Sequence, residues 1–273
     1  MMTSAATLTA SRRGHYGLRE IVASEWTKLR SVRSTVWTLL ITVVAGIGIS
    51  ALITSATASR WADRSPADQA SFDPTRSSLA GLLFAQLAVG VLAVLVVSAE
   101  YSTGTIRATL AAVPRRPLVL VAKVVVFGAL VLVTGELTSF AAFAIGQRVL
   151  SGHTPTASLS DPDAVRAVVS GGLYLTALGL LGLGLAAIVR HTAAAISIFV
   201  GVLFILPVIT AVLPSSLVDD VSRFLPAAIG TVMISAHHHD ANAFGPWPSF
   251  ALLAGYAAAA LVAGGILLTR RDA

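Results

Sequence analysis

The chain has 273 residues, of which 55% are hydrophobic and only 12% are charged. A soluble domain carries about 25% charged residues, so this composition excludes a protein whose whole surface faces water. The absence of cysteine excludes structural disulfides and thiolate metal sites, and the net charge of +6 is distributed as expected for membrane topology, so no nucleic-acid partner is predicted.

The chain begins with two segments that precede the first long apolar run. Residues 1–17 are polar, rich in Ser, Thr and Ala, and are predicted to be a disordered tail. Residues 18–34 are predicted to form an interfacial amphipathic helix, because apolar residues recur there at spacings of three and four while basic residues lie elsewhere. An ordinary surface helix packed on a core is the alternative. The predicted apolar face comprises Leu18, Ile21, Val22, Trp26, Leu29 and Val32.

Long uncharged runs decide the fold class. Five runs are 23 residues or longer, and a sixth apolar stretch, 124–147, contains a single acid, Glu136. A spanning helix needs about 20 apolar residues, and the ten-residue alternation of a membrane barrel is missing. The sequence predicts an all-α, polytopic membrane protein whose six-helix transmembrane domain covers residues 35–273. Its spans are predicted at about 36–57, 78–99, 119–149, 168–189, 193–213 and 249–269.

Basic residues predict the orientation, because they favour the cytoplasmic side of a membrane. With both termini inside, the inner segments hold thirteen Lys and Arg residues and the outer loops hold six. The acidic residues have the opposite distribution, with eight in the outer loops and four in the inner segments. We therefore expect both termini, and the connector between spans 2 and 3, to be cytoplasmic.

This connector, 100–123, carries a helical pattern between Gly104 and Pro114. An apolar stripe is expected on the helix, with Arg107 on another side and two further arginines beyond its end. The pattern predicts a short helix that presses its stripe into a groove on a soluble partner, with arginines at the rim. A basic turn that only fixes topology is the alternative. The stripe comprises Ile106, Leu110 and Val113.

The runs SEWTKLRSVRSTVWTLL (24–40) and EYSTGTIRATLAAVPRRPLVLVAK (100–123) resemble permease subunits of actinobacterial ABC-2-type ABC transporters. The resemblance covers the six spans, the cytoplasmic termini, the interfacial helix and the outer region before span 6. It implies that the connector contains the coupling helix that docks on the ATPase subunit, and that Glu100 and Tyr101 form the boundary of span 2. It places the ATPase contact at Gly104, Thr105, Ile106, Arg107 and Leu110, flanked by Arg115 and Arg116.

The chain contains no Gly-x-x-x-x-Gly-Lys-Ser/Thr run to cradle phosphates. It is therefore predicted to be a transport subunit rather than an enzyme and to bind no cofactor itself. ATP and Mg would be bound by a separate ATPase subunit. Six spans fit half of a transporter, so a second permease copy or a paralogue is also expected, in the bacterial plasma membrane.

Two features leave alternatives open. Glu136 lies about 20 Å along its helix from Lys123. Inserting a carboxyl at this depth in the membrane raises the free energy by about 2.5–3.5 kcal/mol. It is either a pathway residue or a structural carboxyl paired with Thr or Ser neighbours. The segment 214–247 is predicted to be a re-entrant or outer-leaflet helix. Its run His237–His239 is not predicted to bind metal, because consecutive residues do not easily direct three imidazoles at one ion.

The leading hypothesis is a permease that is driven by a partner ATPase, with export as the expected direction. A non-transporting membrane anchor or assembly factor that recruits an ATPase is the alternative. An intramembrane enzyme is less favoured, because the in-span serines have no in-span histidine to act as a base. The identity of the cargo is not predicted.

Overall fold

The computed structural model describes residues 17–113, 115–212, 221–237 and 243–270, and every element in these ranges is helical, which confirms the all-α prediction. The elements are α1 (Leu18–Ser31), α2 (Arg33–Ser59), α3 (Pro66–Ala70), α4 (Pro74–Leu79), α5 (Leu82–Ser102), α6 (Thr105–Ala112), α7 (Arg116–Leu150), α8 (Pro162–Val189), α9 (Thr192–Val200), a π-helical turn (Gly201–Ile205), α10 (Leu206–Val212), α12 (Pro226–Met233) and α13 (Pro246–Arg270).

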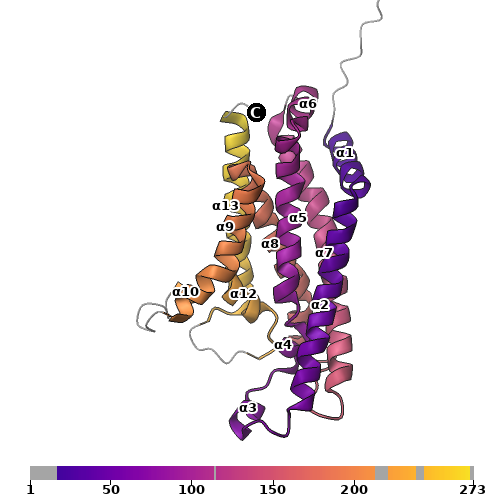
Figure 1. Ribbon diagram of the computed structural model, residues 1–273, viewed down its shortest axis with the longest axis vertical. Coiled ribbons are helices and arrows are strands. Elements are labelled where there is room, and N and C mark those ends of the chain that lie inside the picture. The colour runs from indigo at the N-terminus through magenta and orange to yellow at the C-terminus, as the bar shows by residue number, and fades with distance from the viewer. Residues whose placement is uncertain (1–16, 114, 213–220, 238–242, 271–273) are drawn as a thin grey trace, which may run out of the picture.

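Six helical segments of the described chain are long and apolar enough to cross a membrane. Each includes the described part of one predicted span, and residue 213 of the fifth lies outside the described residues. Figure 1 shows them as one elongated bundle. Helices α1 and α6 and the C-terminal end of α13 lie at one end, here called the α6 end, and α3 lies at the opposite end, here called the α3 end.

Helix α2 has its polar side chains inside and its apolar side chains outside. Small polar residues such as Thr42, Ser50 and Thr54 are buried against the bundle, whereas Trp37 and Leu52 are exposed. This pattern would be unstable in water, but it suits lipid, where small residues allow helices to approach closely and apolar residues face the acyl chains. The polarity of α2 therefore supports a membrane environment independently of its length.

Helix α2 packs closely against the junction of α4 and α5. The backbone N–H of Gly81 donates a hydrogen bond to Ser50 Oγ at 3.0 Å. A Cβ atom at Gly81 would collide with the carbonyl oxygen of Gly46 and with Ser50. The contact requires glycine at position 81, and it joins span 1 to the part of span 2 nearer the α3 end.

Helix α8 is the centre of the bundle, with two thirds of its apolar window buried. It contacts α5, α7, α9, α12 and α13. The fully buried hydroxyl of Tyr174 donates to Gln86 Oε1 on α5, which satisfies both polar groups inside the bundle. Gly230 of α12 leaves space for the Tyr174 ring.

Span 5 is irregular near Pro207. The π-helical turn Gly201–Ile205 ends two residues before this proline. Proline lacks a backbone N–H and its ring crowds the carbonyl four residues earlier, so a wider turn relieves the crowding. Beyond the turn, α10 diverges from the bundle (Figure 1).

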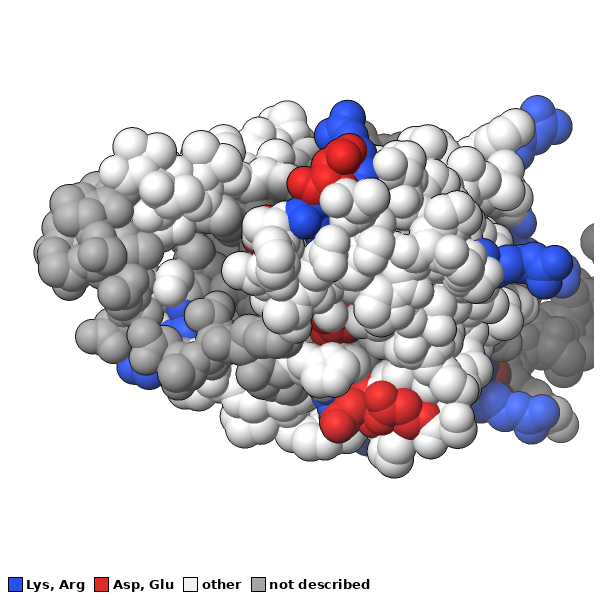
Figure 2. Space-filling model, turned by 90° about the horizontal axis from the view of Figure 1, so that it is seen from below, with Lys and Arg blue, Asp and Glu red and all other residues white. Residues whose placement is uncertain are grey.

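At the α3 end, residues 235–237, which follow α12, contact α8 and the residue that precedes α4. Asp73 is buried, and its Oδ2 accepts hydrogen bonds from the backbone N–H groups of Ala236 at 2.8 Å and His237 at 3.1 Å. Arg166 of α8 donates to the carbonyl of Ser235 at 2.7 Å. Figure 2 shows this end, where patches of acidic side chains lie next to basic side chains on a largely uncharged surface. In the segment 214–247, predicted as an outer-leaflet helix, α12 packs on α13 and α8, while 214–220 and 238–242 lie outside the described residues.

Candidate functional site

The connector between spans 2 and 3 forms a short helix, α6, at the α6 end of the bundle (Figure 1). Gly104 precedes it with a φ of 72°, a left-handed conformation that glycine adopts without strain. This residue turns the chain sharply after α5, and the hydroxyls of Thr103 and Thr105 lie 2.9 Å apart across the turn. Helix α6 ends at Ala112, and Pro114 lies outside the described residues.

The apolar stripe of α6 does not face a partner, which corrects the expected use of these residues. Ile106 is 5% exposed and Val113 is 8% exposed. Val113 and the partly buried Leu110 pack with apolar residues of α1 and α7, including Ile21 and Val119. The chain uses this stripe to hold α6 against its own bundle, because those neighbouring helices present an apolar surface at the same height.

The opposite face of α6 is exposed. Arg107, Ala108, Ala111 and Ala112 lie on it, and Arg107 makes no ion pair with another described residue. Arg115 is also exposed just before α7, and Arg116 is partly buried at its first turn. The surface that α6 offers is therefore basic with small side chains between the charges.

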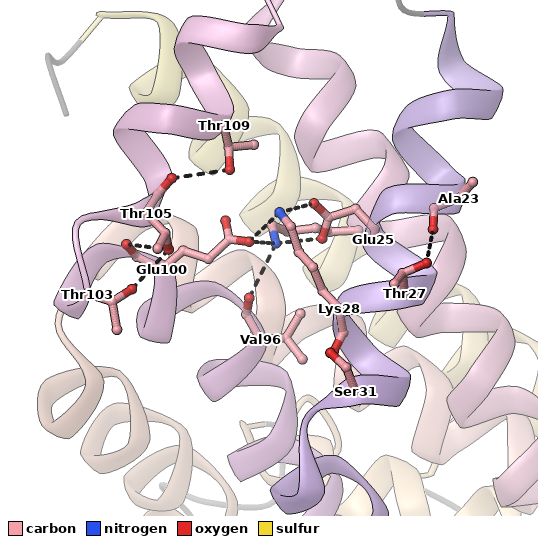
Figure 3. Close-up of polar contacts among 11 residues, drawn as sticks. Ala23, Glu25, Thr27, Lys28, Ser31, Val96, Glu100, Thr103, Thr105 and Thr109 are labelled. Carbon is pink, nitrogen blue, oxygen red and sulfur yellow. Dashed lines mark hydrogen bonds and ion pairs between the residues drawn. The ribbon is translucent and has the colours of Figure 1, made fainter.

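Beside α6, four charged residues from three helices form one ion-pair network (Figure 3). Lys123 Nζ of α7 lies 2.7 Å from Glu25 Oε2 of α1 and 2.9 Å from Glu100 Oε1 of α5. Lys28 Nζ of α1 lies 2.7 Å from Glu25 Oε1 and 2.8 Å from the same Glu100 oxygen. We call these residues, Glu25, Lys28, Glu100 and Lys123, the ionic cluster.

The ionic cluster is balanced in charge and mostly shielded from solvent. The side chains of Lys123 and Glu25 are 5% and 3% exposed, and that of Lys28 is 39% exposed. Lys123 also donates to the carbonyl of Val96 at 3.4 Å, so its three N–H groups all have acceptors. Burial opposes the charged form of Lys28, but hydrogen bonds and attraction from Glu100 and Glu25 outweigh it and raise the pKa of Lys28.

The second residue of the predicted boundary motif, Tyr101, has a different partner. The guanidinium of Arg190 lies 5.2 Å from the centre of the Tyr101 ring, a cation–π distance. Arg190, which ends α8, also donates to the carbonyl of Leu267 on α13 at 2.7 Å. The two boundary residues therefore connect α5 to different sides of the bundle, with Glu100 facing α1 and α7 and Tyr101 facing the α8–α9 turn.

The sequence alone does not predict the ionic cluster. Glu100 is expected only at the boundary of span 2, and no sequence pattern joins Glu25 and Lys28 to Lys123. One signal was available in the sequence. Glu25 lies four residues after Ile21 and four residues before Leu29, so the three residues share one face of the helix. An acid on a buried apolar face requires a cation as its partner, here supplied in part from elsewhere in the chain.

Glu136 lies at the contact between α7 and α8, next to Gly172. Its Oε2 is buried and accepts no hydrogen bond from the described residues. The neighbouring hydroxyls of Thr134, Thr138 and Ser139 each donate to a backbone carbonyl instead. The contacts thus do not provide the Thr or Ser pairing considered for a structural role, and a pathway role stays a hypothesis.

Gly172→Ala is expected to destabilise the folded chain by about 1 kcal/mol, the low end of the cost of overpacking, because the carboxyl that must move ends a flexible side chain. A Cβ atom at position 172 would lie 2.5 Å from Glu136 Oε1, so the carboxyl must move. The measurement is the fraction of monodisperse protein that remains after heating in detergent.

Gly128→Ala is the matched control, because a Cβ atom there meets only Leu180 at 3.6 Å. The double variant Glu136→Ala, Gly172→Ala should recover much of the loss, since the two residues are in contact. Equal stability of Gly172→Ala and Gly128→Ala would contradict this packing.

No group of three or more potential metal-ligating side chains occurs within the part of the chain that the structure describes. His237 is described, whereas His238 and His239 lie outside the described residues. The described geometry adds nothing in favour of a metal centre at this run.

Comparison with protein families gives a match to the family described as ABC-2 family transporter protein, over residues 21–208. The matched region runs from α1 into α10 and contains both α6 and the ionic cluster. A comparison with curated proteins finds none that matches. Because the match covers more than half of the chain and includes four of the six candidate spans in full and most of the fifth, the chain belongs to the ABC-2 family of transporter proteins and is a multi-pass membrane protein.

Proposed function

We propose that the chain is the permease subunit of an ABC transporter and that a separate ATPase subunit docks on α6. The observation that carries this proposal is the basic, exposed face of α6, held on the end of the bundle by its own buried stripe. ABC-2 family membrane proteins work with ABC ATPase subunits in general. The contact residues are Gly104, Thr105, Arg107, Arg115 and Arg116. ATP and Mg are bound by the partner.

Movement of α6 is transmitted to the spans through two sets of contacts. The buried stripe joins α6 to α1 and α7, and the ionic cluster joins α1, α5 and α7 immediately beside it. Helix α7 has 35 residues and is about 52 Å long at 1.5 Å per residue, longer than the hydrocarbon core of about 30 Å. Docking at one end of α7 therefore displaces its other end as well.

At the α3 end, α7 is connected to span 2 and to the following loop through Gln147. Its Nε2 donates to the carbonyl of Pro74 and to Ser78 Oγ, both at 3.0 Å. Its Oε1 accepts from the backbone N–H of Ala157 at 2.7 Å. A displacement that begins at α6 can thus alter the opposite membrane side, which is what an alternating transport pathway requires.

The α6 end is assigned to the cytoplasm of a bacterial plasma membrane, with both termini inside. The support is the excess of basic residues in the segments that the sequence predicts to be inside, thirteen against six in the predicted outer loops. Two permease chains, identical or paralogous, would line the pathway, and export is the proposed direction. The alternative is a membrane anchor that recruits an ATPase. It differs from a permease only because it has no transport pathway.

Affinity purification of the full chain in mild detergent tests the proposal. An ATPase subunit should copurify in equal number with the permease chain, and the complex should hydrolyse ATP. Transport by the complex in vesicles separates a permease from an anchor. Absence of any nucleotide-binding subunit from the purified, monodisperse chain would overturn the proposal.

A further inference from the structure

Helix α1 is covered by the rest of the bundle on one side only. Ile21, Glu25 and Leu29, which follow one another at intervals of four residues, are its buried residues. Ile21 packs with Val119 of α7, and Leu29 belongs to the main core of the bundle. These apolar side chains are not free to contact the bilayer, so a membrane contact of α1 must use another side of the helix.

A second side of α1 carries arginine and tryptophan. An α-helix turns by about 100° per residue, so Arg19, Trp26 and Arg30 lie within about 40° of one another around the helix. All three are exposed, as is Ala23, which lies on the side of α1 away from the ionic cluster in Figure 3. We call Arg19, Ala23, Trp26 and Arg30 the arginine–tryptophan side.

The arginine–tryptophan side is positively charged and contains no acid. Arg19 and Arg30 make no ion pair with another described residue. The two acids of α1 lie elsewhere, because Glu25 is buried in the ionic cluster and the Glu20 carboxylate lies beside Gly17 at the start of the helix. Two cations with no acid between them favour an anionic partner.

The position of α1 in the chain indicates that this partner is the membrane. A single residue, Val32, joins α1 to α2, the first candidate span. Trp26 is 47% exposed before this junction, and Trp37 is 64% exposed after it. Tryptophan is enriched where the acyl chains of a bilayer meet the headgroups. The arginines beside Trp26 are therefore placed at the level of the lipid phosphates.

We propose that the arginine–tryptophan side of α1 binds anionic phospholipids at the α6 end of the bundle, with Arg19 and Arg30 on the headgroups. The guanidinium group suits phosphate because it offers two parallel N–H donors. Each basic side chain near an anionic membrane surface strengthens binding about fivefold, equivalent to about 1 kcal/mol. An acidic protein surface is the other possible partner, and it would keep Trp26 away from lipid. This inference rests on the membrane location of the family and not on the ATPase contact.

Quenching of Trp26 fluorescence by brominated lipids tests the proposal in the full chain without an ATPase. The combined substitutions Trp37→Phe, Trp61→Phe and Trp247→Phe leave Trp26 as the single tryptophan. Phosphatidylglycerol, which has a net negative charge, is brominated on its acyl chains and mixed as a minor component with phosphatidylcholine in nanodiscs. Its local fraction at Trp26 should exceed its bulk fraction about fivefold or more. Phosphatidylcholine with the same brominated acyl chains and no net charge should show no such enrichment.

Loss of charge separates this contact from the general charge of the α6 end. Arg19→Gln and Arg30→Gln should each lower the enrichment, and the double variant should abolish it. Arg270→Gln is the matched control, because it removes an exposed cation from the end of α13 at the same end of the bundle. It should leave the enrichment at Trp26 unchanged.

Native mass spectrometry provides a second measurement on the chain with all four tryptophans. From nanodiscs with equal amounts of the two lipids, the chain should retain an excess of phosphatidylglycerol that the double variant loses. Equal enrichment of the two lipids at Trp26, or an unchanged enrichment in the double variant, would overturn the proposal. Absence of quenching by either lipid would also overturn it, in favour of a protein partner.

Discussion

Lys123→Met is expected to destabilise the folded chain by about 3–5 kcal/mol, the cost of removing one partner from a buried ion pair. Lys123 is the cation that connects Glu25 of α1 with Glu100 of α5, at 2.7 and 2.9 Å. Without it, two buried carboxylates share the single, half-exposed ammonium of Lys28. The expected result is a large loss of folded, monodisperse protein, measured by size-exclusion chromatography after heating in detergent.

Two further variants separate the ion pairs from simple packing. Lys28→Met should cost only about 1 kcal/mol, because its side chain is 39% exposed and such pairs contribute little. Adding Glu25→Gln to Lys123→Met should recover part of the stability by removing one unpaired charge. Equal losses for Lys28→Met and Lys123→Met, with no recovery in the double variant, would contradict the proposed balance of charges.

The contribution of Lys28 to the ionic cluster should not change with pH near neutrality. The pKa of Lys28 is raised in the folded chain above its ordinary value of 10.5. Its contribution to stability is therefore fully present below pH 10.5 and is lost only as the pH rises through the raised pKa. Unfolding curves recorded at neutral and at strongly alkaline pH check this direction.

Arg107→Glu is expected to weaken binding of the ATPase subunit by about 2 kcal/mol or more, the size of an interface hot spot. This corresponds to roughly thirtyfold in affinity. Arg107 is exposed, so the stability of the permease itself should change by less than about 0.5 kcal/mol. The measurements are the amount of copurified ATPase and the ATP hydrolysis of the complex, with thermal stability recorded on the same samples.

Arg148→Glu is the matched control for this charge reversal. Arg148 is exposed on the last turn of α7, at the opposite end of the bundle from α6. It should leave ATPase binding unchanged. Equal loss of binding in both variants would indicate a general effect of charge rather than a contact through α6.

The sequence was sufficient to predict the fold class because membrane spans depend on run length and charge, both of which are local. Helix α6 was also predictable, since Gly104 provides the turn and the apolar spacing provides the helix. The direction in which the apolar stripe of α6 points was not predictable. Periodicity identifies an apolar face, but it does not say whether the chain or a partner covers it, and Ile106 is buried within this chain.

The ionic cluster is a second feature that could not be predicted from the sequence. Glu25 and Lys123 are 98 residues apart, and no local pattern connects them. The same holds for Glu136, whose closest constraint is a glycine on the next helix. Side chains such as these are positioned by the packing of three helices, which a single sequence does not reveal.

Site-directed cross-linking tests the contact between α6 and the ATPase most directly. The chain has no cysteine, so Ala111→Cys places a single thiol on the exposed face of α6 for a photoreactive maleimide. An adduct between the permease and the ATPase subunit is predicted from position 111, and none is predicted from Arg148→Cys at the other end of α7. Two results would contradict the coupling contact. One is that position 111 forms no adduct although the complex hydrolyses ATP, and the other is that positions 111 and 148 form equal amounts of adduct.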